Sequence, residues 1–270
     1  MEYRMRTSTV LPKWLDSHIF GVLGATISPV KGNMTVIDWG KDDMPSYLGT
    51  YFPRSYAESY CIFSHYFSNN ISEWRHRREI SILGFGCGTG GDIFGLLMAI
   101  AENLGSVRRV HMHALDGNRH CLRLYEELLD IMRVRMPFDI DSREGFIAID
   151  DNYDLGVTSY VIDGRFDIAL SFKAIGEFAT RNCFGKDNPY RNIATQLYGK
   201  LNDGGIMLIA DITSFCNAQG EWFPDMLDRG LADAGCRVVD GNKGHNQQFH
   251  VSHSRADNYT TKIAWRIIRK

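Results

Sequence analysis

From about residue 80 onwards, short runs of hydrophobic residues alternate with stretches in which hydrophobic residues recur every three or four positions. The runs have the length of buried strands, and the spacing of three and four is that of a helix with one buried face. Strands are predicted at 80–85, 110–115, 146–149, 160–162, 166–172, 206–210, 236–239 and 262–268. Helices are predicted at 93–104, 122–132, 189–201 and 223–234. Strands that alternate with helices in this order predict a parallel sheet covered by helices on both faces.

The first 79 residues follow a different pattern, which predicts a helical segment ahead of the sheet domain. Aromatic residues recur there at spacings of four, four, three and four, which places them on one face of a helix: Phe52, Tyr56, Tyr60, Phe63 and Phe67. This face either packs on the sheet domain or covers a bound cofactor or base. We therefore divide the chain into a cap segment at 1–79 and a sheet domain at 80–270.

The overall composition excludes several classes of protein. The 270 residues include 30 Lys and Arg against 32 Asp and Glu, and 44% are hydrophobic, so the chain is neither disordered nor a strongly basic nucleic-acid coat. The six cysteines are widely separated and contain no C-x-x-C pair, so we expect reduced thiols, no metal site and a cytoplasmic protein. No run of about 18 apolar residues is present, so no membrane partner is expected.

Glycine is the one residue type in excess, with 26 in the chain, and it concentrates after the first predicted strand. The segment Gly86-Cys87-Gly88-Thr89-Gly90 lies between a strand and a helix, where a doubly wound sheet binds its ligand. It resembles the first motif of the class I S-adenosylmethionine-dependent methyltransferases, a strand that ends in G-x-G-x-G. The resemblance covers about residues 79–270. It implies an α/β fold with a Rossmann-like, doubly wound, seven-stranded and mainly parallel sheet whose C-terminal strand is antiparallel.

The same resemblance implies which residues hold S-adenosylmethionine. The loop glycines would line its methionine and ribose parts, Asp116 would accept hydrogen bonds from both ribose hydroxyls, and Gly117 would flank the adenine. Asp92 either binds the methionine ammonium or caps the following helix. The family usually has an acid at the position of Gly84, so the role of that acid is either missing here or taken by Asp92. The expected cofactor-binding residues are Gly84, Gly86, Cys87, Gly88, Gly90, Asp92, Asp116, Gly117, Ser171 and Phe172.

Two alternatives to a methyltransferase remain open. Gly86, Gly88 and Gly91 also satisfy the dinucleotide fingerprint G-x-G-x-x-G, and an acid after the second strand such as Asp116 binds the ribose in NAD proteins too. The glycine loop begins some 80 residues into the chain, and the predicted sheet domain closes with a pair of strands. Both features favour a methyltransferase over an NAD-binding protein. The alternatives are an NAD-binding oxidoreductase and a non-catalytic methyltransferase-like binding or scaffold protein.

The chemistry of methyl transfer is expected in the loop that follows the predicted strand 166–172. This loop lacks the Asn/Asp-Pro-Pro-aromatic motif of amino-group methyltransferases and the Pro-Cys nucleophile of pyrimidine C5 methyltransferases. Lys173 and Glu177 lie four positions apart. We predict them as the catalytic pair that orients the acceptor or accepts its proton, with an ordinary i,i+4 ion pair as the alternative.

A second resemblance concerns residues 47–57, which are similar to the Y-x-x-x-R-x-P-A-T-Y-A segment of the small-ribosomal-subunit methyltransferase-like family. Pro53, Tyr56 and Ala57 match, whereas Arg54 follows the proline instead of preceding it, and the cysteine cluster of that family is absent. On this likeness Arg54 and Tyr56 are predicted to contact the substrate. RNA is accordingly ranked first as the unidentified methyl acceptor, ahead of a small metabolite and a protein side chain.

Local basic clusters bear on the RNA hypothesis. They occur at 75–78, at 108–109, at 133–135 and at the C-terminus, although the net charge of the chain is −2. Clusters of this kind are usually solvated surface. If they meet at the mouth of the cofactor pocket, they would supply the phosphate contacts that an RNA acceptor needs. The sequence does not indicate an oligomeric state.

Overall fold

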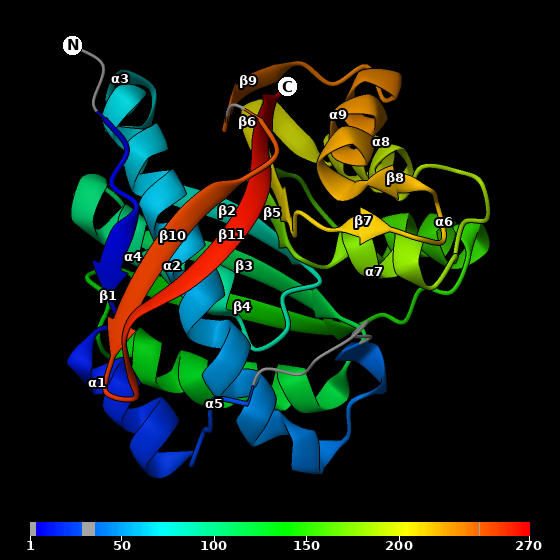
Figure 1. Cartoon of the computed structure of the whole chain (residues 1–270). Helices are drawn as coiled ribbons and strands as arrows, with labels where there is room; N and C mark the ends of the chain where they lie inside the picture. Colours follow the sequence, from blue (N-terminus) through cyan, green and yellow to red (C-terminus); the bar gives the residue numbers. More distant parts are fainter. Residues whose placement is uncertain (1–3, 29–35, 243) are drawn as a thin grey trace.

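The structure, a computed structural model of the chain, describes residues 4–28, 36–242 and 244–270. In this part of the chain nine strands form one sheet with the order β1-β10-β11-β6-β5-β2-β3-β4, and β9 pairs with β11. The strands from β6 to β4 in this order run parallel, whereas β11 runs antiparallel to β6, β9 and β10. Helices cover both faces of the sheet (Figure 1). The predicted α/β doubly wound fold is therefore confirmed.

The bounds of the elements are as follows. The strands are β1 Ser8–Val10, β2 Glu79–Phe85, β3 Arg109–Asp116, β4 Asp139–Phe146, β5 Phe166–Phe172, β6 Leu201–Asp211, β7 Phe215–Cys216, β8 Glu221–Trp222, β9 Val238–Gly241, β10 Gln247–His253 and β11 Ala256–Arg269. The α-helices are α1 Lys13–Asp16, α2 Met44–Asn69, α3 Ile71–Trp74, α4 Gly91–Asn103, α5 Arg119–Arg133, α6 Asn152–Val161, α7 Ile175–Thr180, α8 Pro189–Tyr198 and α9 Phe223–Asp233. Short π and 3-10 segments lie at Ser17–Val22, Val36–Asp38 and Lys41–Asp43.

The sheet has two more strands than the seven predicted. β9 and β10 pair one after the other with β11, so together they take the place of one interrupted strand. The other addition is β1, which pairs in parallel with β10 so that Ser8 lies opposite His250. Three residues are too short a run to show a strand period in the sequence.

Three local predictions were wrong. The strand predicted at 146–149 lies instead at β4, which ends at Phe146, and the residues predicted as a strand at 160–162 fall at the end of α6. β4 is an edge strand with few buried side chains, so backbone pairing defines it rather than a hydrophobic run. No strand was predicted between 239 and 262, yet β10 lies there; from Phe249 onwards its side chains alternate between buried and half-buried.

Two hydrophobic cores lie on the two faces of the sheet. Alternate residues of a strand point to opposite faces, so Ile168 and Leu170 belong to one core while Ala169 between them belongs to the other. The first core lies under α2, α4 and α5, and the second under α6, α7, α8 and α9. Each strand of the sheet centre is therefore hydrophobic on both sides, as its sequence suggested.

Helix α2 packs directly on α4 because two glycines let the helix backbones approach. A Cβ on Gly91 would lie 2.6 Å from the carbonyl oxygen of Phe52, and one on Gly95 would lie 2.4 Å from that of Tyr56. The aromatic face of α2 is buried in this contact, so its packing role is confirmed. The predicted cap segment thus shares a hydrophobic core with the sheet domain.

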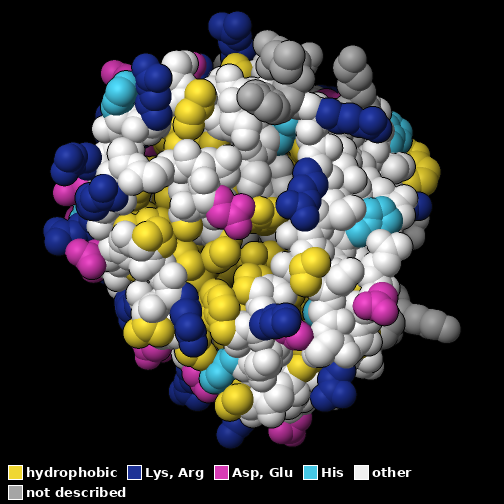
Figure 2. Space-filling view, turned by 90° about the vertical axis from the view of Figure 1, so that its left-hand side faces the viewer, with side chains coloured by type: hydrophobic (Ala, Val, Ile, Leu, Met, Phe, Trp, Pro, Cys, Tyr) yellow, Lys and Arg dark blue, Asp and Glu magenta, His cyan; other side chains and the backbone are white. Residues whose placement is uncertain are grey.

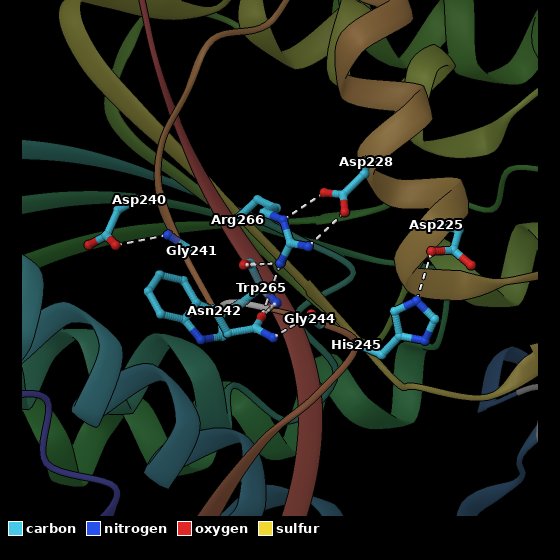
Figure 3. A network of polar contacts seen from close by, with 9 residues as sticks. All are labelled: Asp225, Asp228, Asp240, Gly241, Asn242, Gly244, His245, Trp265 and Arg266. Atoms are coloured by element: carbon cyan, nitrogen blue, oxygen red, sulfur yellow. Dashed lines mark hydrogen bonds and ion pairs between the residues drawn. The ribbon is translucent and has the colours of Figure 1, made fainter.

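The interruption between β9 and β10 is held by a polar network around Arg266 of β11 (Figure 3). Arg266 is buried, and its guanidinium contacts both carboxylate oxygens of Asp228 on α9, at 2.6 and 2.7 Å. The same guanidinium donates to the side-chain oxygen of Asn242 at 3.0 Å. Asn242 also accepts a hydrogen bond from the backbone N–H of Trp265 at 2.7 Å. The network therefore joins α9, β11 and the gap between β9 and β10.

Hydrophobic side chains also reach the surface. They gather around a hollow on the side of the molecule that carries β1, α1 and α4 (Figure 2). In the N-terminal part of the chain Val10 is 63% exposed and Val22 is 69% exposed, and neither lines the cavity described below. None of the helices in the described part of the chain combines the length and the apolar character needed to span a membrane.

Candidate functional site

A cavity of about 350 Å³ lies at the carboxyl ends of the parallel strands. The last residues of four strands line it, namely Phe85 of β2, Asp116 of β3, Phe172 of β5 and Asp211 of β6. The chain passes from β4 at one edge of the sheet to β5 on the other side of β2, so the strand order reverses between β2 and β5. A reversal of this kind leaves a crevice outside the strand ends, where open α/β sheets bind ligands.

The glycine loop after β2 adopts backbone conformations that favour glycine. Gly86, Gly88 and Gly90 have φ angles of 65, 53 and 85°. A Cβ on Gly86 would lie 2.3 Å from Cβ of Ala174, and one on Gly88 would lie 2.3 Å from the hydroxyl oxygen of Tyr47. Both the turn and these close approaches therefore require glycine, and Gly86 lines the cavity.

Asp116 connects this loop to the end of β3. Its Oδ2 accepts a hydrogen bond from the backbone N–H of Gly88 at 2.6 Å, and its Oδ1 accepts one from that of Asn118 at 2.8 Å. Burial raises the pKa of Asp116 to about 6, although these backbone donors favour the charged form. The carboxylate lies at the cavity wall, as a ligand for a pair of ribose hydroxyls would need.

Asp92 lies in the first turn of α4 and is only 2% exposed. Its Oδ2 is buried and has no hydrogen-bond partner in the part of the chain that the structure describes. Burial, together with the nearby Asp116, raises the pKa of Asp92 to about 7, although the backbone N–H groups of Ile93 and Asp92 and the charge of Lys173 oppose the shift. The N-cap of α4 is Gly90, so Asp92 is not its N-cap residue. A buried carboxylate oxygen without a partner is a site for a hydrogen-bond donor such as an ammonium.

Lys173 and Glu177 both line the cavity, but the ion pair of Lys173 is made elsewhere. Its Nζ lies 2.7 Å from Oε2 of Glu58, a fully buried residue of α2 whose Oε1 accepts a hydrogen bond from Thr261. The alternative interpretation, an i,i+4 ion pair between Lys173 and Glu177 on one helix, does not hold, because Lys173 has a φ of 58° and α7 begins only at Ile175. Lys173, whose backbone is in the left-handed region, thus precedes α7, and its side chain points toward α2.

Two tyrosines of α2 that the sequence analysis assigned to no site line the cavity. Tyr47 and Tyr51 lie one helical turn apart with ring centroids 5.2 Å from each other. Burial raises the pKa of Tyr47, so its hydroxyl stays protonated against the glycine loop. Nearby, Ile37 packs on Gly117, where a Cβ would lie 2.7 Å from its Cδ1. The N-terminal segment therefore forms one wall of the cavity, and the spacing of the two tyrosines in the sequence was the available signal.

The predicted substrate-binding residues Arg54 and Tyr56 do not line the cavity. The guanidinium of Arg54 lies 4.2 Å from the ring centroid of Tyr259 on β11. Tyr56 is 2% exposed and stacks on Tyr60 in the contact between α2 and α4. The two residues therefore lie on different faces of α2, Arg54 toward β11 and Tyr56 at the contact with α4.

The predicted cofactor-binding residues separate into two groups. Those that line the cavity are Gly86, Asp116, Gly117 and Phe172. Those that lie behind the lining are Gly84, Cys87, Gly88, Gly90, Asp92 and Ser171. Gly84 has a packing role, because a Cβ there would lie 2.7 Å from the side chain of Ile93 on α4. Burial raises the pKa of the Cys87 thiol, which keeps it protonated.

Asp211 is a cavity residue that the sequence analysis missed. Its Oδ2 accepts hydrogen bonds from the backbone N–H of Gly176 at 2.7 Å and from the hydroxyl of Tyr190 at 2.9 Å. Its Oδ1 accepts one from the backbone N–H of Ile212 at 2.8 Å, and burial raises its pKa to about 6. Asp211 therefore ties β6 to α7 and α8. An acid directly after the predicted strand 206–210 was the signal in the sequence.

The basic clusters lie at the opposite end of the sheet. Arg109 is in register with Glu79 and Asp139 at the amino ends of β2 and β4, and Arg269 pairs with Ile206 at the start of β6. These clusters therefore do not meet at the mouth of the cavity, because the amino and carboxyl ends of the strands lie at opposite edges.

No family model matches the chain, and no curated protein sequence matches it either. Solved structures are similar to it. The CurJ carbon methyltransferase is 13% identical, with a TM-score of 0.53 over 85% of this chain and 58% of its own. The DszA carbon methyltransferase is 14% identical, with a TM-score of 0.50 over 86% and 60%. TehB from Haemophilus influenzae is 16% identical, with a TM-score of 0.45 over 78% and 68%.

At such identities the likeness to the two carbon methyltransferases shows the fold alone, and this chain spans less than two thirds of the length of either. The chain has the α/β Rossmann-like methyltransferase fold.

Proposed function

We propose that the protein is an S-adenosylmethionine-dependent methyltransferase. The observation that carries the proposal is the buried, unpartnered Oδ2 of Asp92, which lies behind the cavity lining and close to Asp116, whose carboxylate lines the cavity at the carboxyl ends of the strands. S-adenosylmethionine has a sulfonium and an ammonium, and its cations would be stabilised by these two carboxylates. The same cations would favour the ionised forms of both acids, whose pKa values burial raises to about 7 and about 6.

The residues present fit the cofactor. Asp116 would accept hydrogen bonds from the ribose hydroxyls, and Asp92 would accept one from the ammonium. At Gly86 the absence of a side chain exposes the backbone to the cavity. Gly117 and Phe172 offer flat surfaces for the adenine ring. Tyr47, which lies against Gly88, would cover the cofactor from the side of α2.

When bound, S-adenosylmethionine supplies a methyl group that an acceptor displaces from sulfur in line, so the protein contributes mainly position and, where needed, a base. Glu177 lines the cavity and is our proposed proton acceptor. Lys173 is held by Glu58, so we assign it a positioning role. It anchors the start of the loop after β5 to α2 and places a positive charge near Asp92 and Asp211.

Titration calorimetry with S-adenosylmethionine, S-adenosylhomocysteine and NAD tests the proposal. We expect both sulfur compounds to bind and NAD not to bind. Asp116→Ala should weaken S-adenosylmethionine binding about tenfold to a hundredfold, because a hydrogen bond to a charged group contributes roughly 1.5–3 kcal/mol. Asp139→Ala, which removes an exposed carboxylate at the amino end of β4, is the matched control.

Each alternative has its own outcome in the same experiments. Binding of NAD alone would contradict the proposal in favour of an oxidoreductase. Binding of S-adenosylmethionine without transfer of its labelled methyl group to any component of a cell extract would favour a non-catalytic binding protein. Full affinity of Asp116→Ala would show that the ribose is held elsewhere.

A further inference from the structure

Part of the cavity wall is formed by apolar and aromatic side chains from the ends of β2 and β5 and from segments that follow β5. We call this part the aromatic pocket and define it by Phe85, Phe172, Phe178, Ile212, Phe215 and Phe223, all of which line the cavity. Phe178 comes from α7, Phe215 from β7 and Phe223 from α9. The rings of Phe85 and Phe178 have centroids 6.3 Å apart. Such walls suit a flat aromatic body, since aromatic pairs gain energy beyond their buried area.

The charges around the cavity do not suit a polyanion. Among the described residues that line it the cations are Lys173 and Arg181, and both are paired with carboxylates. Lys173 lies 2.7 Å from Glu58, and Arg181 lies 2.5 Å from Asp150. The lining acids are Asp116, Glu177 and Asp211. An RNA acceptor would require free cations at this place, and the basic clusters of the chain lie at the other end of the sheet.

The aromatic pocket is also bounded by the small hairpin β7–β8. Gln219, in the turn of this hairpin, donates hydrogen bonds to the carbonyl of Gly185 at 2.9 Å and to the side-chain oxygen of Asn182 at 3.3 Å. The hairpin is thereby fixed to the connection between α7 and α8. The whole cavity, of which the aromatic pocket is one part, has a volume of about 350 Å³, at the lower end of the range for sites that hold small molecules.

We propose that the methyl acceptor is a small, uncharged aromatic molecule with one nucleophilic O–H or N–H group, which binds in the aromatic pocket. This inference rests on the proposed function. The lone pair of the acceptor oxygen or nitrogen forms the bond to the methyl carbon, and the carbon–sulfur bond breaks with its electron pair going to sulfur. The acceptor proton goes to the carboxylate of Glu177, so the products are the methylated acceptor and S-adenosylhomocysteine.

Two variants of the same hairpin provide a matched test. Phe215 lines the cavity and Trp222 does not, yet both are 45% exposed and their rings contact each other with centroids 5.6 Å apart. Phe215→Ala and Trp222→Ala therefore remove the same ring contact, and only the first removes part of the aromatic pocket. Because both side chains are half exposed, we expect both variants to fold and to bind S-adenosylhomocysteine as the wild type does.

The probe is 2-naphthol, titrated into protein saturated with S-adenosylhomocysteine and followed by calorimetry. We expect binding to the wild type, a loss of affinity of about tenfold in Phe215→Ala, and a change of less than about twofold in Trp222→Ala. In parallel, the labelled methyl group is followed from S-adenosylmethionine into a cell extract. We expect the label in the fraction of small, organic-soluble compounds.

Three results would overturn the inference: no binding of 2-naphthol to the wild type, an equal effect of the two variants, or label in RNA or protein. Each leaves the proposed function standing as long as S-adenosylhomocysteine binds and a methyl group is transferred. Failure of the wild type to bind S-adenosylhomocysteine would instead contradict the proposed function, and the inference with it.

Discussion

The substitution Asp92→Asn isolates the effect of one buried charge. Asp92 is 2% exposed, and its Oδ2 has no hydrogen-bond partner among the described residues. Burial therefore raises its pKa from 3.8 to about 7. Asparagine has nearly the same shape and cannot ionise, so the variant keeps the packing of α4 and loses only the charge.

The sign of the effect follows from proton binding. Between pH 3.8 and about 7 the folded state holds the proton of Asp92 and the unfolded state does not, so stability decreases as the pH rises through this window. The whole shift corresponds to roughly 4 kcal/mol above pH 7. We therefore expect Asp92→Asn to be more stable than the wild type at pH 8, by up to roughly 4 kcal/mol, and to gain much less at pH 5.

The assay is urea unfolding of both proteins at pH 5 and pH 8 without cofactor, followed by far-ultraviolet circular dichroism. Asp139→Asn, at an exposed carboxylate, is the control and should leave the free energy of unfolding unchanged at both pH values. Calorimetry at pH 8 should show that the stabilised variant binds S-adenosylmethionine more weakly, because it cannot offer a carboxylate to the ammonium. A variant that is no more stable than the wild type at pH 8 would refute the argument from burial.

Three further predictions concern the same region. Lys173→Met leaves Glu58 buried without its partner and should lower the free energy of unfolding by about 3–5 kcal/mol, measured by urea unfolding, whereas the double variant Lys173→Met, Glu58→Leu should recover most of this loss. A loss below about 1 kcal/mol would mean that the ion pair is not desolvated. Gly91→Ala should cost about 1–3 kcal/mol in the same assay, because its Cβ would lie 2.6 Å from a backbone oxygen of α2; an unchanged midpoint would contradict the close helix contact. The affinity for S-adenosylmethionine, measured by calorimetry, should rise between pH 5 and pH 8 as Asp92 and Asp116 ionise, and a flat profile would separate these acids from binding.

Much of the local structure could be predicted because it depends on neighbouring residues. The helix predicted at 189–201 does begin at Pro189, and Asn188 caps it. The period of buried residues located α4, α5 and the central strands. The edge strands β1 and β4 could not be found in this way, since backbone pairing with a distant strand stabilises them and few of their side chains are buried.

The candidate site shows the same division. The glycine loop and Asp116 could be predicted because a turn and the end of a strand are local features that require particular residue types. The partner of Lys173 could not: it is Glu58, which lies far away in the sequence on α2. Tyr47 likewise reaches the glycine loop only because α2 packs on α4. The role proposed for Glu177 and the likeness of residues 47–57 to the ribosomal family stay predictions.

The sequence by itself determined the central strands, the helices α4, α5, α8 and α9, the doubly wound fold and the loop at which a cofactor would bind, because hydrophobic period and glycine position act over a few residues. Only the tertiary structure decided which side chains face one another across the cavity. It brought Phe215 of β7, Phe223 of α9 and Phe178 of α7 together in the lining of one cavity, and it placed the basic clusters at the amino-terminal edge of the sheet. Contacts between elements distant in the sequence depend on packing, which no local pattern encodes.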